Sequence, residues 1–169
     1  MKRLILSVII GCFLTVSAFS EGYTGLVRYF SPGKVFSLLL PADWKQANKG
    51  KSFAVISRNE NVSVNGSAYY KKPSTDLKNF ADTRWEVIRE KQPFYKRIKG
   101  PYELELTASK AVAADYEGVW PGTKGITHYF VVCTQAGDTL VSLAFTMTKE
   151  EFLKNGDFYL RLAKTLQVD

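Results

Sequence analysis

The sequence predicts an α+β fold, in which an antiparallel β-sheet of six to eight strands packs with two main helices. Several short segments alternate apolar and polar residues, which is typical of strands with one buried face. Two longer segments repeat apolar residues at spacings of three and four, which is typical of amphipathic helices. The 169 residues are 46% hydrophobic and 23% charged, as in folded globular proteins. We therefore expect one folded domain after an N-terminal signal.

The predicted signal occupies residues 1–20. Lys2 and Arg3 form a basic start, and an apolar stretch follows over residues 4–16. Small residues come next, as at the cleavage site of a secretory signal peptide. The apolar stretch is shorter than the roughly 20 residues that span a bilayer. We therefore expect a periplasmic or secreted protein.

Cleavage after Ala18 or Ser20 would leave a mature domain over residues 21–169. The run Ile9-Ile10-Gly11-Cys12 is similar to a lipobox, but the apolar stretch continues after the cysteine. An ordinary cleaved signal is therefore favoured over lipoprotein anchoring through Cys12. Cys133 is then the sole thiol of the mature chain, so an intramolecular disulfide is excluded.

The strands are predicted from alternation and from the turn residues between them. Residues 31–34 and 59–61 mark the turns of two N-terminal hairpins. Residues 126–134 are almost continuously apolar or aromatic, which indicates a central strand covered on both faces for part of its length. The predicted strands are 23–31, 35–40, 53–58, 62–70, 102–107, 112–117, 126–134 and 140–147.

The first helix is predicted over residues 75–92, after capping residues and before Pro93, which forbids continuation. Near the C-terminus, Thr148 and Glu151 have the spacing of a capping box and predict a short helix. Asp157 is predicted to cap a separate last helix. Both helical regions carry an apolar stripe that must pack on the sheet.

Residues 35–44 read VFSLLLPADW. This run resembles the opening of the PsbP-like superfamily, in which a strand is followed by Pro-x-x-Trp. The order of the later strands and helices is similar to the same group, which includes the extrinsic PsbP subunit of photosystem II, a nuclear Ran-binding protein of the Mog type and exported bacterial proteins of the DcrB type. The resemblance implies a PsbP-like α/β/α sandwich, and a binding or accessory role rather than catalysis.

The charge balance indicates the kind of partner. The chain has 23 Lys and Arg against 16 Asp and Glu, and loss of Lys2 and Arg3 would leave a net charge of +5. This mild basicity favours an acidic envelope or membrane-associated protein partner, or an anionic membrane surface, over nucleic acid. We expect a monomer.

The segment 89–99 is the candidate binding surface, because basic residues there surround two aromatic ones. The alternative is a solvated helix end and loop without a binding role. Trp120 is a second candidate in an exposed loop. The predicted binding residues are Arg89, Lys91, Phe94, Tyr95, Lys96, Arg97, Lys99 and Trp120.

The sequence contains no set of residues that specifies a reaction. His128 is the only histidine and is interpreted as a partly buried residue of the sheet rather than a catalytic base. Cys133 has the opposite strand parity, so the two side chains are predicted to point to opposite faces. One Cys and one His in the mature chain are too few for structural zinc. We therefore expect neither a catalytic set nor a cofactor.

The acidic residues of two adjacent predicted strands leave one metal hypothesis open. One strand register would set Glu105 opposite Asp115 and Glu103 opposite Glu117. Like charges directly opposed are unfavourable unless a cation such as calcium lies between them. A different register, or nearby lysines, would remove the need for the cation, and we expect no metal.

Together these features predict an exported, non-enzymatic binding or accessory protein of the cell envelope, which presents a surface or cleft to a protein partner. The alternative is a carrier or sensor of a small apolar ligand held between the sheet and a helix.

Overall fold

The computed structural model describes residues 25–70, 75–121 and 124–169. The predicted signal peptide, its two candidate cleavage positions and Cys12 lie outside the described residues. The described helices include none with the length and hydropathy needed to cross a bilayer.

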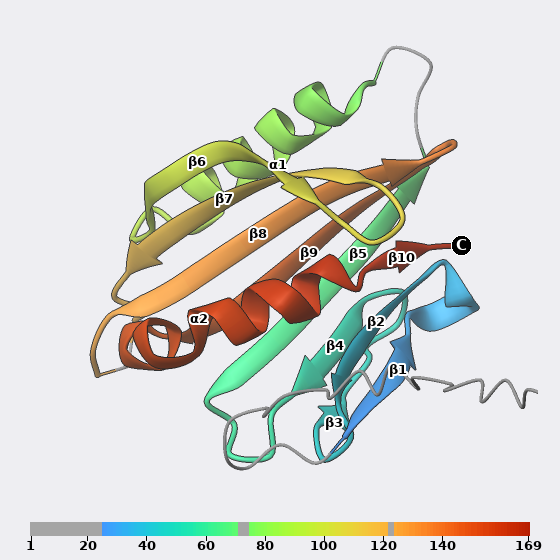
Figure 1. The fold of residues 1–169 in the computed structure, drawn as a ribbon. Coiled ribbons are helices and arrows are strands. Elements are labelled where there is room, and N and C mark those ends of the chain that lie inside the picture. Colours follow the sequence, from blue (N-terminus) through green and yellow to red (C-terminus); the bar gives the residue numbers. More distant parts are fainter. Residues whose placement is uncertain (1–24, 71–74, 122–123) are drawn as a thin grey trace, which may run out of the picture.

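In the described part of the chain, a large antiparallel sheet contains seven strands in the order β3-β4-β5-β9-β8-β7-β6 (Figure 1). A smaller sheet of three strands has the order β1-β2-β10, and a 3₁₀ turn, Pro32–Lys34, joins β1 to β2. The strands are β1 Leu26–Phe30, β2 Phe36–Pro41, β3 Lys45–Gln46, β4 Phe53–Ile56, β5 Val62–Tyr70, β6 Lys96–Glu105, β7 Lys110–Gly118, β8 Thr127–Ala136, β9 Thr139–Thr148 and β10 Gln167–Val168. The predicted α+β class and both N-terminal hairpins are confirmed.

Helix α1, Leu77–Lys91, and helix α2, Lys149–Lys164, lie on opposite faces of the large sheet (Figure 1). The apolar stripe of each helix is buried against the strands, as amphipathic periodicity requires. The small sheet shares its apolar core with α2. The buried stripes are Phe80, Ala81, Trp85 and Ile88 in α1, and Phe158, Tyr159, Leu162 and Ala163 in α2.

The central strand β8 separates two apolar cores. Phe130 and Val132 belong to the core beneath α2, whereas Val131 and Cys133 belong to the core beneath α1. Successive side chains of a strand point to opposite faces, so this division follows from the sequence order. The prediction that this strand is covered on both faces is confirmed, and so is the placement of Cys133 on the face opposite His128.

Helix α1 begins as predicted, because the Asp76 carboxylate accepts a hydrogen bond from the backbone N–H of Asn79 at 2.7 Å. The prediction of two C-terminal helices is wrong. Thr148 caps a single helix by accepting from the Glu151 N–H at 3.1 Å, and the helix continues through Gly156 and Asp157. A helical glycine costs only about 1 kcal/mol, and the buried stripe that continues beyond it outweighs that cost.

Strand β6 begins at Lys96, six residues before the predicted strand, so residues 96–99 are neither a helix end nor a loop. Register shifts between Arg97 and Lys99, and between Lys99 and Tyr102, move the pairing with β7. The register that would set Glu105 opposite Asp115 and Glu103 opposite Glu117 is therefore not formed. The observed partners are Lys96 with Glu117, Lys99 with Asp115, Glu103 with Val112, and Glu105 with Lys110.

This register removes the reason for placing a cation between β6 and β7, because a lysine or an apolar residue lies opposite each of the four carboxylates. Among the described residues, no group of three or more His, Cys, Asp or Glu could hold a metal ion.

Gly118 fixes the connection between α1 and β6. A Cβ atom at this position would lie 2.1 Å from the carbonyl oxygen of Phe94 and 3.0 Å from the Cα of Tyr95. Both are backbone atoms, so a side chain cannot be accommodated without moving the chain. The close approach therefore holds Tyr95 against the sheet.

We predict that Gly118→Ala lowers the free energy of unfolding by about 2 kcal/mol or more, because the backbone of residues 94–95 must shift to admit the methyl group. Denaturation with guanidinium chloride measures this. Gly25→Ala is the control, because a Cβ at Gly25 meets no described atom within 4 Å. Equal unfolding midpoints for the two variants would contradict the prediction.

Candidate functional site

A cavity of about 350 Å³ opens between α2 and strands β6, β7 and β8, and we call it the α2 cleft. Its deep wall combines aromatic and apolar side chains with a small number of polar groups, which is a common composition of binding sites. The lining residues are Ile98, Lys99, Tyr102, Asp115, His128, Phe130, Phe152, Leu153, Lys154, Gly156, Asp157 and Leu160.

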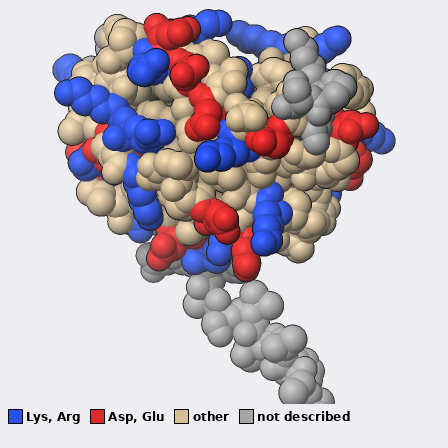
Figure 2. Space-filling model, turned by 90° about the horizontal axis from the view of Figure 1, so that it is seen from above, with Lys and Arg blue, Asp and Glu red and all other residues tan. Residues whose placement is uncertain are grey.

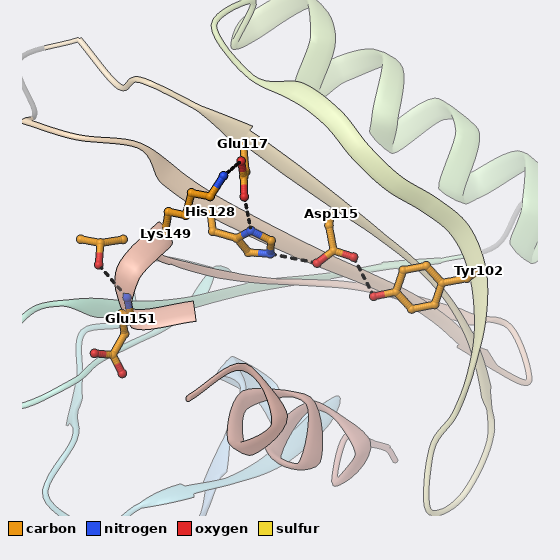
Figure 3. A network of polar contacts seen from close by, with 7 residues as sticks. Tyr102, Asp115, Glu117, His128, Lys149 and Glu151 are labelled. Carbon is orange, nitrogen blue, oxygen red and sulfur yellow. Dashed lines mark hydrogen bonds and ion pairs between the residues drawn. The ribbon is translucent and has the colours of Figure 1, made fainter. Parts of the chain in front are cut away.

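A chain of polar contacts crosses the floor of this cleft, with His128 at its centre (Figure 3). His128 Nε2 lies 2.9 Å from an Asp115 carboxylate oxygen, and His128 Nδ1 lies 3.5 Å from a Glu117 oxygen. Both contacts are hydrogen bonds when both ring nitrogens carry a proton. His128 is fully buried and Asp115 is 3% exposed. The prediction of a partly buried histidine is therefore wrong, and the burial of Asp115 was not predicted, because α2 covers this face.

Tyr102 extends the chain of contacts at one end. Its hydroxyl donates to the second oxygen of Asp115 at 2.8 Å. Burial raises the pKa of Tyr102, and the negative charge of Asp115 raises it further, so the phenol keeps its proton. Asp115 thus accepts hydrogen bonds on both oxygens and is fully engaged within the fold.

Helix α2 closes the other end of the chain of contacts. Lys149, its first residue, donates from Nζ to the second oxygen of Glu117 at 2.8 Å. This hydrogen bond, together with the one to His128, lowers the pKa of Glu117 against the opposing effect of burial. One turn later, Phe152 stacks on the His128 ring with centroids 3.5 Å apart and planes within 10°. The first turns of α2 are therefore tied to β7 and β8.

The residue types that line the α2 cleft can be compared with what nucleophilic catalysis requires. A histidine paired with a carboxylate can act as a base when a nucleophile lies beside it. The described residues that line the cleft include no Ser, Thr or Cys. Both ring nitrogens of His128 already face carboxylates, so the imidazole contributes to structure.

The mouth of the α2 cleft is apolar and basic. Leu153 is 74% exposed and Ile98 is 53% exposed. Leu153 also borders a second hollow of about 340 Å³, which is lined in part by Lys124, Ile126 and Lys149. An exposed leucine therefore stands between two depressions, and lysines lie on both sides of it.

The predicted basic surface is divided by the sheet. Arg89, Tyr95, Lys96 and Arg97 line a cleft of about 640 Å³ on the face of α1, which we call the α1 cleft. Lys99 lines the α2 cleft on the other face. The other residues of the α1 cleft are Asp82, Trp85, Glu86 and Tyr116. The segment 89–99, which was predicted as one contact surface, thus contributes residues to two separate clefts.

The aromatic residues of the predicted binding surface pack largely against other aromatic side chains. Tyr95 is buried and stacks on Tyr129 at 5.3 Å between centroids, and Phe94 is half-buried. Trp120 is 42% exposed, and its ring lies 4.9 Å from that of Phe94. Lys91 is exposed at the end of α1. These aromatic side chains position the α1–β6 connection rather than form an exposed row.

Charges of both signs are interspersed on the face seen from above in Figure 2, which shows acidic groups between the basic ones. A uniformly basic field, such as a polyanion would require, is not visible on that face.

Cys133, the thiol predicted to be alone in the mature domain, is buried and free. Burial raises its pKa to about 11. The thiol therefore stays protonated at neutral pH and is a core residue rather than a nucleophile.

The polar floor and the exposed Leu153 were missed by sequence reasoning. Asp115, Glu117 and His128 share one face of adjacent strands, and this concentration of ionisable groups was the available signal. Its interpretation required knowing that α2 covers that face. Leu153 lies on the side of α2 opposite Leu162, but the predicted break before Asp157 meant that the periodicity was not followed across the whole helix.

No protein-family model matches the chain, and no curated protein matches it in sequence. Solved structures do match. Cyanobacterial PsbP (CyanoP) from Synechocystis sp. PCC 6803 aligns with a TM-score of 0.69 and 12% identity, over 90% of this chain and 98% of that one. The Ran-binding protein Mog1p of Saccharomyces cerevisiae aligns with a TM-score of 0.60 and 10% identity, over 86% and 96%.

LpqN, a protein involved in cell envelope biogenesis of Mycobacterium tuberculosis, aligns with a TM-score of 0.55 and 11% identity, over 79% of this chain and 82% of that one. The chain therefore has the PsbP-like fold, and the predicted resemblance is confirmed at the level of fold.

We predict that Lys149→Met lowers the free energy of unfolding at pH 7 by about 1 kcal/mol or less, because the lysine is 39% exposed and its pairing is screened by water. The pKa of Glu117 is lowered in the folded state. Its stabilising effect is therefore complete above its unfolded pKa and is lost as the pH falls through its folded pKa.

The difference between wild type and Lys149→Met should accordingly disappear in chemical denaturation once the pH lies below the lowered, folded-state pKa of Glu117. Lys154→Met is the matched control, because Lys154 lies on the same helix and makes no ion pair with a described residue. A difference that stays constant from neutral to acid pH would exclude Glu117 as the group responsible.

Proposed function

We propose that this protein is an exported, non-enzymatic binding or accessory protein of the cell envelope, and that its α2 cleft receives an apolar segment of an acidic protein partner. The observation that carries this proposal is the mouth of the cleft. Leu153 is 74% exposed there and stands between two hollows.

A protein partner is favoured by the openness of this region. Sites that bury most of a small ligand have volumes of roughly 300–1,000 Å³, and the α2 cleft lies at the low end of that range. Its rim extends outward over Ile98, Ile126 and Leu153, which are all exposed. Clustered exposed apolar side chains are typical of protein interaction sites.

The charge at the rim favours an acidic partner. Lys99, Lys124 and Lys154 are exposed around the two hollows. Lys149 is already paired with Glu117, and the acidic residues of the same rim are Glu150 and Asp157. Three unpaired lysines against two carboxylates leave a modest positive excess among the described residues, and complementary charge speeds encounter and selects partners.

The non-enzymatic character is supported by the engagement of His128, whose two ring nitrogens both face carboxylates. The envelope location is supported by the signal-like N-terminus and by the likeness to LpqN, whose described role is in cell envelope biogenesis.

A second candidate function is the carriage of a small apolar ligand. It is favoured by the inner wall of the α2 cleft, where Phe130, Phe152 and Leu160 lie beside the Tyr102 phenol. Binding of such a ligand would not require the exposed Leu153.

We predict that a photo-crosslinking amino acid in place of Leu153 captures one dominant envelope protein in the native host. Mass spectrometry of the product should locate the attachment in a segment with an apolar residue next to Asp or Glu. Lys154→Glu in the same chain should reduce the yield, because it reverses a charge at the rim.

The matched controls are the same crosslinker in place of Lys51, an exposed residue before β4, and the substitution Lys51→Glu. The same products from position 51, or no product from position 153, would contradict the proposal. A small molecule retained in native mass spectrometry and lost in Phe130→Ala would instead support the carrier.

A further inference from the structure

The α1 cleft contains a group of polar atoms that the fold leaves unused. Trp85 Nε1, Tyr95 Oη and Tyr116 Oη are buried, and none of them has a partner at standard hydrogen-bond distance and angle among the described residues. Thr127 lies near Tyr95 and Arg97 lies near Tyr116, and each opposes the rise in pKa that burial causes in the phenol beside it, as a group that donates towards the phenol oxygen does. Trp85, Tyr95 and Tyr116 are 6%, 5% and 4% exposed, respectively. Buried polar groups are normally paired. The concentration of these atoms in the lining of one cleft therefore points to a ligand that pairs with them.

All of these atoms can act as donors. An indole N–H only donates. Burial raises the pKa of Tyr95, and it raises the pKa of Tyr116 to about 12 even though the positive charge of Arg97 opposes the shift. Both phenols therefore keep their protons at neutral pH. The part of the ligand that pairs with these donors is therefore rich in hydrogen-bond acceptors.

Cationic side chains stand next to these donors. The Arg97 guanidinium lies 5.5 Å from the centre of the Trp85 ring and close enough to Tyr116 to influence its pKa. Lys96 and Arg89 are exposed in the lining of the same cleft. A donor forms a stronger hydrogen bond with a charged acceptor than with a neutral one. The acceptor group is therefore an anion.

The wall formed by α1 limits how much negative charge the ligand carries. Asp82 and Glu86 line the cleft, are exposed and make no ion pair with a described residue. Two carboxylates against three cations leave a small positive excess. This balance favours a single negative charge over a polyanion.

The size of the cleft indicates that the anion is part of a larger molecule. Its volume of about 640 Å³ far exceeds that of one oxyanion group, and Trp85, Tyr95 and Tyr116 present aromatic surface. We propose that the α1 cleft binds an organic anion with one oxyanion group on an apolar body, either a free carboxylate or the phosphodiester headgroup of a phospholipid. This site is separate from the α2 cleft and does not depend on its function.

Arg97 controls access to the donors. The three polar atoms have almost no accessible surface, whereas the Arg97 side chain, which lies against Trp85 and near Tyr116, is exposed and belongs to the edge strand β6. Binding therefore requires Arg97 to turn from the Trp85 ring towards the ligand. Such a movement exchanges a cation–π contact for a charge-assisted hydrogen bond.

Isothermal titration calorimetry of the purified protein with 3-phenylpropionate tests the proposal, with the neutral 3-phenylpropanol as the comparison. We expect the acid to bind and the alcohol not to bind. Tyr116→Phe and Arg97→Met should each weaken the affinity for the acid by about fivefold or more. Tyr70→Phe is the control and should bind as wild type does, because Tyr70 is 87% exposed and lies outside the cleft.

Tyr116→Phe removes a buried hydroxyl whose neighbour Arg97 is an exposed side chain that water can solvate instead, so its melting temperature without ligand should stay close to that of wild type. Cosedimentation with phosphatidylcholine vesicles, with and without phosphatidylglycerol, identifies the source of the anion. Binding that needs phosphatidylglycerol and is lost in Arg97→Met assigns the site to a lipid headgroup. Binding of the acid alone assigns it to a free small molecule. Equal affinity of wild type and Tyr116→Phe, equal binding of acid and alcohol, or no binding in either assay would overturn the proposal.

Discussion

The α2 side of the molecule depends on the buried hydrogen bond between Asp115 and His128. An unpaired carboxylate or imidazole at this depth would be strongly unfavourable. The pair therefore fixes the register of β7 against β8, and Phe152 and Lys149 extend this order into α2 through the stacked ring and through Glu117. The same set of contacts therefore connects the polar floor of the α2 cleft to the wall that α2 forms.

A second constraint is the alternation of side chains along β7. Asp115 points into the α2 cleft, whereas its neighbour Tyr116 points into the α1 cleft. Because helices cover both faces, each strand can supply polar groups to two sites without bringing them together. A single strand can therefore contribute side chains to two separate clefts. The same alternation explains why the basic segment 96–99 contributes to both of them.

The sequence was sufficient to predict helix α1 and most of the strands, because turns, caps and alternation are local properties. The PsbP-like fold was predicted from the resemblance of residues 35–44 and of the order of elements. The sequence was insufficient where packing overrides local preference. Gly156 and Asp157 signalled a helix break, yet the apolar stripe of α2 continues past them. The register between β6 and β7 was not predicted, because the pair Gly100-Pro101, which lies in the second register shift, was not recognised as the sign of a bulge. The burial of Asp115 was missed because its coverage by α2 is a tertiary feature.

The most direct test of this account is a double-mutant cycle on the central pair, with Asp115→Asn, His128→Gln and the double variant unfolded in guanidinium chloride. If the pair organises the α2 side as described, the two substitutions should be coupled by about 2 kcal/mol or more, because each single variant leaves a buried polar partner unsatisfied. Effects that add to within about 0.5 kcal/mol would show that the two residues act independently. The α2 cleft would then need another structural basis.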